Sequence, residues 1–142
     1  MRYVNYKLTL YEDTVIIPLN RPCKCNVGLV EISMAEINST AHDGNAIDIT
    51  CEQINSTFDN PDRLLRRIPF NRLRKNEYYH TWTAKYVQMK AVDSDDRFLK
   101  LKVRRTDDNS SLTLGSLFQD NVIFVTLAFS DVELAKTWAS CI

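Results

Sequence analysis

Apolar and polar residues alternate most clearly between residues 98 and 129. Leu99, Leu101 and Val103 are separated by basic residues. Because successive side chains of a strand point to opposite faces, this spacing predicts a strand that is buried on one face. The run at 122–129 is apolar at almost every position, which is typical of a strand inside a sheet or against a neighbouring subunit. We therefore expect a β-sandwich that self-associates, with its last strand in a central position.

Short segments with strand patterning recur along the chain, separated by polar turns such as Asp43-Gly44. No helical pattern alternates with them, as it would in a protein built on a parallel sheet. Regular short strands of this kind indicate an antiparallel sandwich or barrel of about eight strands. The expected strands are residues 2–10, 15–19, 26–34, 46–54, 64–70, 78–91, 98–105 and 122–129.

The C-terminus carries a helical signal instead. Ser130 and Glu133 have the spacing of a capping box, and apolar residues that include Trp138 follow at helical intervals. This pattern predicts a short C-terminal helix. Its apolar stripe would either cover the open end of the sandwich or dock on a neighbouring subunit.

Length and charge place further bounds on the protein. We expect residues 1–142 to form a single domain, because the chain is long enough to bury a core and has no linker or break in composition. Eighteen basic residues balance eighteen acidic ones, so the net charge gives no general attraction to nucleic acid or to an anionic membrane. The sequence has neither the pattern of a signal peptide nor an apolar run that could span a bilayer, and we expect an intracellular location without membrane contact.

The four cysteines do not form a recognisable disulfide or zinc pattern. Cys23, Cys25, Cys51 and Cys141 include no C-x-x-C pair, and we expect partly buried thiols. A zinc site that combines Cys23 and Cys25 with a histidine, His42 or His80, is the alternative reading.

The order of the strand segments carries a resemblance to a known family. The segments concerned are Val15 to Leu19, Cys25 to Ser33, Ile49 to Glu52, Leu64 to Pro69, the aromatic-rich region around Tyr86, and Leu99 to Asp108 leading to Val122 to Leu127. In this order they resemble the single jelly-roll capsid proteins of Polinton or Maverick elements and related adintoviruses. Those proteins have a similar "cevaLvEi" strand, an "LLRxvP" segment and a closing pair of strands joined by an acidic turn.

This resemblance implies a single antiparallel jelly-roll β-sandwich with a structural role in a virion. The expected function is that of a non-enzymatic penton-like or minor capsid protein that self-associates and docks on a capsid shell. Its expected partners are further copies of itself, as a pentamer or else a trimer, and other capsid proteins. The expected location is the virion, after assembly inside the host cell.

Two other classes of function remain open at this point. One is a receptor-binding or carbohydrate-binding β-sandwich, a spike or lectin-like module that would stack sugars on Trp82, Tyr78 and Tyr79. The other is a cellular adaptor sandwich of the kind that forms trimers.

Aromatic residues are the candidates for a subunit interface, because they supply large buried areas at low entropic cost. A place in the core is the alternative for each of them. The candidates are Tyr78, Tyr79, Trp82, Phe124, Phe129 and Trp138.

Basic residues cluster in two parts of the chain. Such clusters either contact DNA phosphates or an acidic neighbour, or form a solvated strand face. Contact with packaged nucleic acid is therefore an open expectation. The first cluster is Arg63, Arg66, Arg67, Arg72, Arg74 and Lys75, and the second is Arg97, Lys100, Lys102, Arg104 and Arg105.

The sequence does not point to catalysis. His42 and His80 lack a nearby nucleophile motif, and there is no phosphate-binding loop or H-E-x-x-H motif. Asp93, Asp95 and Asp96 lie close together in the sequence and could bind Ca²⁺ in a loop, but they lack the spacing and the glycine of an EF-hand. We therefore expect no enzyme activity, no cofactor and no metal site.

Overall fold

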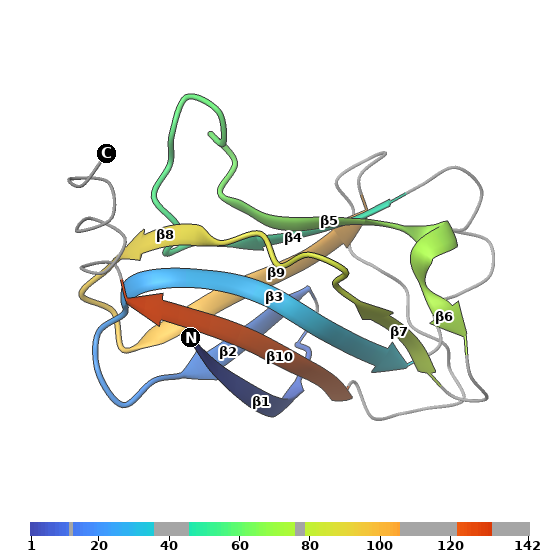
Figure 1. Cartoon of the computed structure of the whole chain (residues 1–142). Helices are drawn as coiled ribbons and strands as arrows, with labels where there is room; N and C mark the ends of the chain where they lie inside the picture. Colours follow the sequence, from blue (N-terminus) through green and yellow to red (C-terminus); the bar gives the residue numbers. More distant parts are fainter. Residues whose placement is uncertain (12, 36–45, 76–78, 106–121, 132–142) are drawn as a thin grey trace.

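The computed structural model describes residues 1–11, 13–35, 46–75, 79–105 and 122–131. In these residues two antiparallel β-sheets pack face to face (Figure 1). The first half of the chain contributes β1 (Arg2–Thr9), β2 (Thr14–Pro18), β3 (Lys24–Ala35), β4 (Ala46–Cys51) and β5 (Leu64–Pro69). The second half contributes a 3-10 turn, η2 (Phe70–Arg72), and the strands β6 (Arg74–Lys75), β7 (Tyr79–Thr83), β8 (Lys90–Asp93), β9 (Phe98–Arg105) and β10 (Val122–Asp131).

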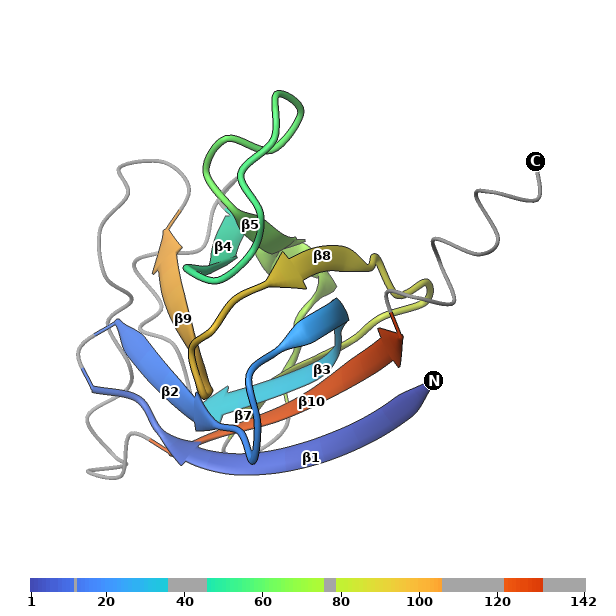
Figure 2. The ribbon, with the colours of Figure 1, turned by 90° about the vertical axis from the view of Figure 1, so that its left-hand side faces the viewer.

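The strand order is that of a jelly roll. The first sheet has the order β1-β10-β3-β7-β6, with β8 also paired to β3, and the second has the order β2-β9-β4-β5. The chain thus passes repeatedly between the two sheets, as Figure 2 shows from the side. This order confirms the predicted single antiparallel jelly roll.

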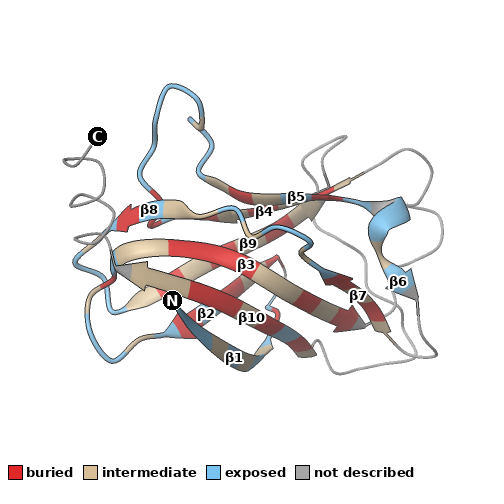
Figure 3. Ribbon diagram, in the orientation of Figure 1, coloured by how far each residue is buried: buried red, intermediate tan, exposed pale blue. Residues whose placement is uncertain are grey.

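The inner faces of both sheets form one apolar core. Leu99, Leu101 and Val103 are buried as their alternation predicted, and Ile123 and Val125 of β10 lie opposite them in the core cluster. Figure 3 shows the alternation of buried and less buried positions along β3 and β10. The strand β10 pairs with β1 on one side and β3 on the other, so its predicted central position is confirmed.

The predicted strand at 78–91 is divided into two. β7 pairs with residues 31–35 of β3 and β8 pairs with residues 24–27, so that together they occupy one strand position. Between them, residues 84–89 leave the sheet. We call this segment the strap. The single long strand expected from the sequence was therefore wrong in this region.

The strap crosses the outer side of the first sheet at Gly28. A Cβ atom at this position would lie 2.5 Å from Cγ1 of Val87 and 2.7 Å from Sδ of Met89. The register between β3 and β10 shifts beside this point, where Leu127 follows Thr126, and such a β-bulge bends a strand locally. Glycine is required at position 28 because the strap approaches the strand so closely.

The predicted C-terminal helix lies outside the described residues. β10 continues to Asp131, and residues 132–142, with Trp138, are not among those described. In the part of the chain that is described, no helix is long and apolar enough to cross a bilayer.

Candidate functional site

The outer surface of the first sheet is lined by hydroxyl and amide groups and one carboxylate, which bond to one another across the strands. Thr126 Oγ1 donates to Asn5 Oδ1 at 2.6 Å, and Thr83 Oγ1 donates to Glu31 Oε1 at 2.9 Å. A further hydrogen bond of 2.8 Å joins the hydroxyl groups of Ser33 and Thr81. We call this surface the hydroxyl face, and its members are Asn5, Glu31, Ser33, Thr81, Thr83 and Thr126.

Two aromatic side chains interrupt the hydroxyl face. Phe124 of β10 and Tyr79 of β7 meet edge to face, with ring centroids 6.0 Å apart and an interplanar angle of 76°. Phe124 is still 39% exposed, although it lies on a central strand. The register places Lys7 beside it on β1, and Arg74 lies further along the same cross-strand row. Two of the six candidate interface residues thus form one aromatic spot, with Lys7 beside it and Arg74 on the far side of two intervening strands.

Trp82 lies on the inner side of the same sheet. It is 7% exposed and pairs with Ile32. The Arg66 guanidinium lies 5.0 Å from the centre of its ring, and Arg66 Nη1 donates to the Tyr86 carbonyl oxygen at 3.2 Å. Arg66 therefore closes the edge of the sandwich between β5 and β7, and the ring of Trp82 has no open face on which a sugar could stack.

The remaining aromatic candidates differ in position. Phe129 is half-buried against the core, with the Arg2 guanidinium 6.0 Å from its ring centre. Tyr78 and Trp138 lie outside the described residues.

The outer surface of the second sheet carries charges that meet in pairs. Arg67 on β5 binds Asp48 on β4 through two hydrogen bonds, of 2.7 and 2.9 Å. Arg104 Nε on β9 donates to Asp13 Oδ2 at 2.7 Å. The register sets Arg67, Asp48 and Arg104 side by side, and Asp13 continues the row through its hydrogen bond with Arg104. We call the surface that they define the charged face.

The two ion pairs differ in their surroundings. Burial alone would raise the pKa of Asp13, but the hydrogen bonds from Arg104 and Thr14 outweigh it and hold this pKa below its usual value. On the more exposed pair, the hydrogen bond to Asp48 raises the pKa of Arg67. Both arginines are thereby engaged within the chain.

The six residues of the first basic cluster do not share one surface. Arg66 points into the edge of the sandwich and Arg67 onto the charged face, because neighbours on a strand point in opposite directions. Arg63 lies before β5, whereas Arg72 and Arg74 are exposed beyond its other end. Lys75 belongs to β6, but its side chain is not described.

A loop of residues 52–63 joins β4 to β5 and projects from the sandwich (Figures 1 and 2). Its side chain Phe58 is 99% exposed. Asn60 supports the loop from within, since its Oδ1 accepts from Leu64 N at 2.9 Å and its Nδ2 donates to Leu64 O at 3.0 Å. The loop ends at Arg63, whose φ of 57° is unusual for a residue other than glycine. We call residues 52–63 the β4–β5 loop.

A polar hollow of about 560 Å³ lies at the base of this loop. Gln53 is buried beside it and is fully engaged: its Oε1 accepts from the Lys100 backbone N–H at 2.8 Å, and its Nε2 donates to Asp96 Oδ2 at 3.0 Å. Glu52, Arg63 and Asp93 also line the hollow. Gln53 thus ties the β4–β5 loop to the turn before β9.

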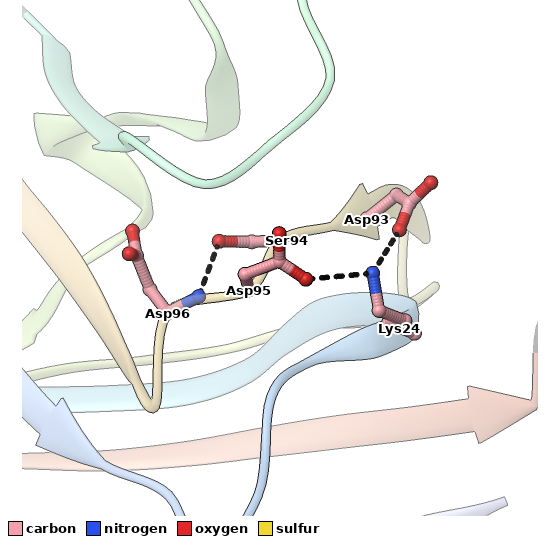
Figure 4. Close-up of polar contacts among 5 residues, drawn as sticks. All are labelled: Lys24, Asp93, Ser94, Asp95 and Asp96. Carbon is pink, nitrogen blue, oxygen red and sulfur yellow. Dashed lines mark hydrogen bonds and ion pairs between the residues drawn. The ribbon is translucent and has the colours of Figure 1, made fainter.

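The end of β8 and the turn that follows it carry three aspartates, Asp93, Asp95 and Asp96. Lys24 forms ion pairs with the first two, as Figure 4 shows. Lys24 Nζ lies 2.8 Å from Asp93 Oδ1 and 3.3 Å from Asp95 Oδ1. The Asp96 backbone N–H donates to Ser94 Oγ at 3.0 Å. In the described ranges, no three His, Cys, Asp or Glu residues are grouped as a metal site would need.

The cysteines that are described are thiols. Sγ of Cys23 and Sγ of Cys25 lie 3.4 Å apart without a disulfide, and burial raises the pKa of Cys51 to about 11. His80 is buried on the inner side of β7. Cys141 and His42 lie outside the described residues.

None of the protein-family models, curated proteins or solved structures with which the chain was compared matches it. Sequence reasoning missed three features of the molecule: the exposed Phe58, the strap over Gly28, and the pairing of Arg104 with Asp13. A glycine inside a strand pattern was the available signal for the strap.

Proposed function

We propose that the protein is a structural virion component, a penton-like or minor capsid jelly roll that self-associates and docks on a capsid shell. The observation that carries this proposal is the exposed ring of Phe124, which meets Tyr79 edge to face near one end of the strands of the first sheet. The jelly-roll strand order is the fold that the family resemblance implies.

The hydroxyl face is suited to contact with another protein. Its polar side chains already bond to one another, so covering them leaves few groups without a partner. The aromatic spot then supplies apolar area at one end of this surface, and aromatic side chains are among those that dominate the binding energy of protein interfaces. A neutral net charge does not oppose the association of identical chains.

A closed ring is the form of self-association that we propose, most simply a pentamer at a shell vertex, with a trimer as the alternative. Nucleic acid takes a minor part in this proposal. Arg67 and Arg104 are engaged by Asp48 and Asp13, and a phosphate would have to displace those carboxylates.

Native mass spectrometry and light scattering test the proposal. They are applied to the purified chain alone and together with the shell protein of the same virus or transposon. We expect one closed oligomer, or assembly when the shell protein is added. A monomer at tens of micromolar that ignores the shell protein would contradict it. Binding of such a monomer to a glycan array would favour the receptor-binding or carbohydrate-binding alternative.

A further inference from the structure

The β4–β5 loop has the construction of a preformed docking element. In addition to the two hydrogen bonds between Asn60 and Leu64, the backbones of Thr57 and Asn60 bond to each other in both directions, at 3.1 and 3.4 Å. Ser56 Oγ donates to the Pro61 carbonyl oxygen at 3.1 Å. Because the loop is ordered before it meets a partner, binding through it loses little conformational entropy.

The tip of this loop presents an aromatic ring among acidic groups. Phe58 is 99% exposed and makes no contribution to the core. Asp59 follows it directly in the sequence and is exposed, and acids outnumber bases in the loop. An acidic tip of this kind would be repelled by an anionic lipid surface and fits a partner with an apolar contact point and basic flanks.

The chain itself carries such a contact point on the hydroxyl face. Phe124 lies in a cross-strand row that begins with Lys7 beside it and ends at Arg74, with two other strands between Phe124 and Arg74. Tyr79 contacts Phe124 from the neighbouring row. Both basic side chains are exposed, and the described salt bridges do not include either of them. The spot therefore complements the loop tip in both apolar character and charge.

The two surfaces belong to different sides of one molecule. In Figures 1 and 2 the β4–β5 loop projects above the sandwich, whereas β1 and β10 lie at its lower side. A contact between loop and spot must therefore join two copies of the chain. It is a head-to-tail contact, which forms a ring if the rotation closes and a filament if it does not.

We propose that Phe58 of one copy packs on Phe124 and Tyr79 of the next, with Asp59 directed toward Lys7, which lies beside the spot. This inference rests on the self-association in the proposed function and assigns the two surfaces that produce it. A second copy of the chain is the occupant because both complementary halves are present in every molecule.

Cross-linking of mixed variants tests the head-to-tail geometry directly. Phe58→Cys and Phe124→Cys proteins are prepared separately and treated with a short bis-maleimide, alone and mixed, with the parent protein as the control for its native thiols. We expect cross-linked dimers above the parent background only in the mixture. A cross-link in Phe58→Cys alone, or none in the mixture, would overturn the proposed contact.

Sedimentation velocity over a concentration series tests the energetics. Phe58→Ser should weaken self-association by about tenfold or more, as expected for an aromatic at the centre of an interface. The matched control is Ile16→Ser, which removes a half-exposed apolar side chain from the charged face and should leave association unchanged. Thermal melting of each variant at high dilution separates lost association from lost folding.

A charge exchange gives the most specific readout. Asp59→Lys should weaken association, and Lys7→Glu on the same chain should restore it in part, because each contact again joins opposite charges. Association that survives both Phe58→Ser and Phe124→Ser refutes this contact but leaves the proposed function intact. A parent protein that stays monomeric at every concentration, with and without the shell protein, refutes both.

Discussion

The outer faces of the two sheets are built from similar strands but satisfy their polar groups in different ways. On the charged face, Arg67 binds Asp48 and Arg104 binds Asp13. On the hydroxyl face, hydroxyl and amide groups and one carboxylate, Glu31, bond to one another, and an exposed aromatic side chain, Phe124, lies on the same surface. The same jelly roll thus carries one surface organised by ion pairs and one organised by hydrogen bonds without ion pairs.

This difference decides which surface can be covered at low cost. Covering the charged face would remove water from four ionised groups, and the desolvation of ions offsets much of what a new contact contributes. Covering the hydroxyl face removes water mainly from hydroxyl and amide groups that keep their partners, with Glu31 as the one carboxylate of the network, and it buries an aromatic ring. Clusters of basic residues in the sequence are therefore a poorer guide to the binding surface than the partners that each polar side chain has in the folded chain.

The largest effect is expected at the covered end of the hydroxyl face. Gly28→Ala would bring a methyl group to 2.9 Å from the Gln88 carbonyl oxygen as well as against Val87 and Met89. Because backbone and side chains of the strap must both shift, we expect a loss of about 1 to 3 kcal/mol in the free energy of unfolding. Chemical denaturation measures it, with Asn26→Ala on the same strand as the control. An unchanged midpoint would mean that the strap does not pack on this strand.

A comparable or smaller effect is expected at the less exposed ion pair of the charged face. Asp13→Asn removes the charge that Arg104 binds and should cost about 1 to 3 kcal/mol at neutral pH. Since folding lowers the pKa of Asp13, this stabilisation is present above the usual carboxyl pKa and disappears as the pH falls through the lowered one. The difference between parent and variant in denaturant titrations should therefore shrink below about pH 4. A difference that stays constant from neutral to acidic pH would contradict this account.

The exposed ion pair should matter less. Arg67→Gln breaks both hydrogen bonds to Asp48, but solvent screens the pair, and we expect a loss below about 1 kcal/mol. The same measurement in high salt should reduce the difference further. Adding Asp48→Asn to Arg67→Gln should cost little more than Arg67→Gln alone, which identifies the lost interaction as the one between these two side chains.

The smallest effect on the isolated chain is expected at the aromatic spot. Phe124→Ser removes a side chain that is 39% exposed, and we expect the stability of the monomer to change by less than about 1 kcal/mol. Calorimetry at low concentration measures this change. A loss as large as that of a core residue would place Phe124 with the buried side chains and remove it from the interface.

Alternation along the sequence predicted most of the fold because burial acts on each strand separately. It located the buried side of β9 and the central place of β10. It missed the division of the strand at 78–91, since that depends on the strap meeting Gly28, which is distant in the sequence.

The candidate site was less predictable for the same reason. Arg66 and Arg67 are neighbours in the sequence, yet one packs on Trp82 and the other binds Asp48. Asp13 and Arg104 are 91 residues apart, so no local pattern could indicate their pairing. Phe58 lies in a segment of turn residues that has no hydrophobic periodicity from which its exposure could be inferred.

The strap also changes the edge of the first sheet. An uninterrupted edge strand offers a row of backbone groups to which strands of other chains can add, and this is a common route to aggregation. Here the edge of β3 is occupied by two short strands, β7 and β8, with the strap between them. A strand from another chain could form backbone hydrogen bonds only with the short strands on either side of the strap. The chain can thus present a surface for ordered assembly while limiting the growth of disordered β-aggregates along this edge.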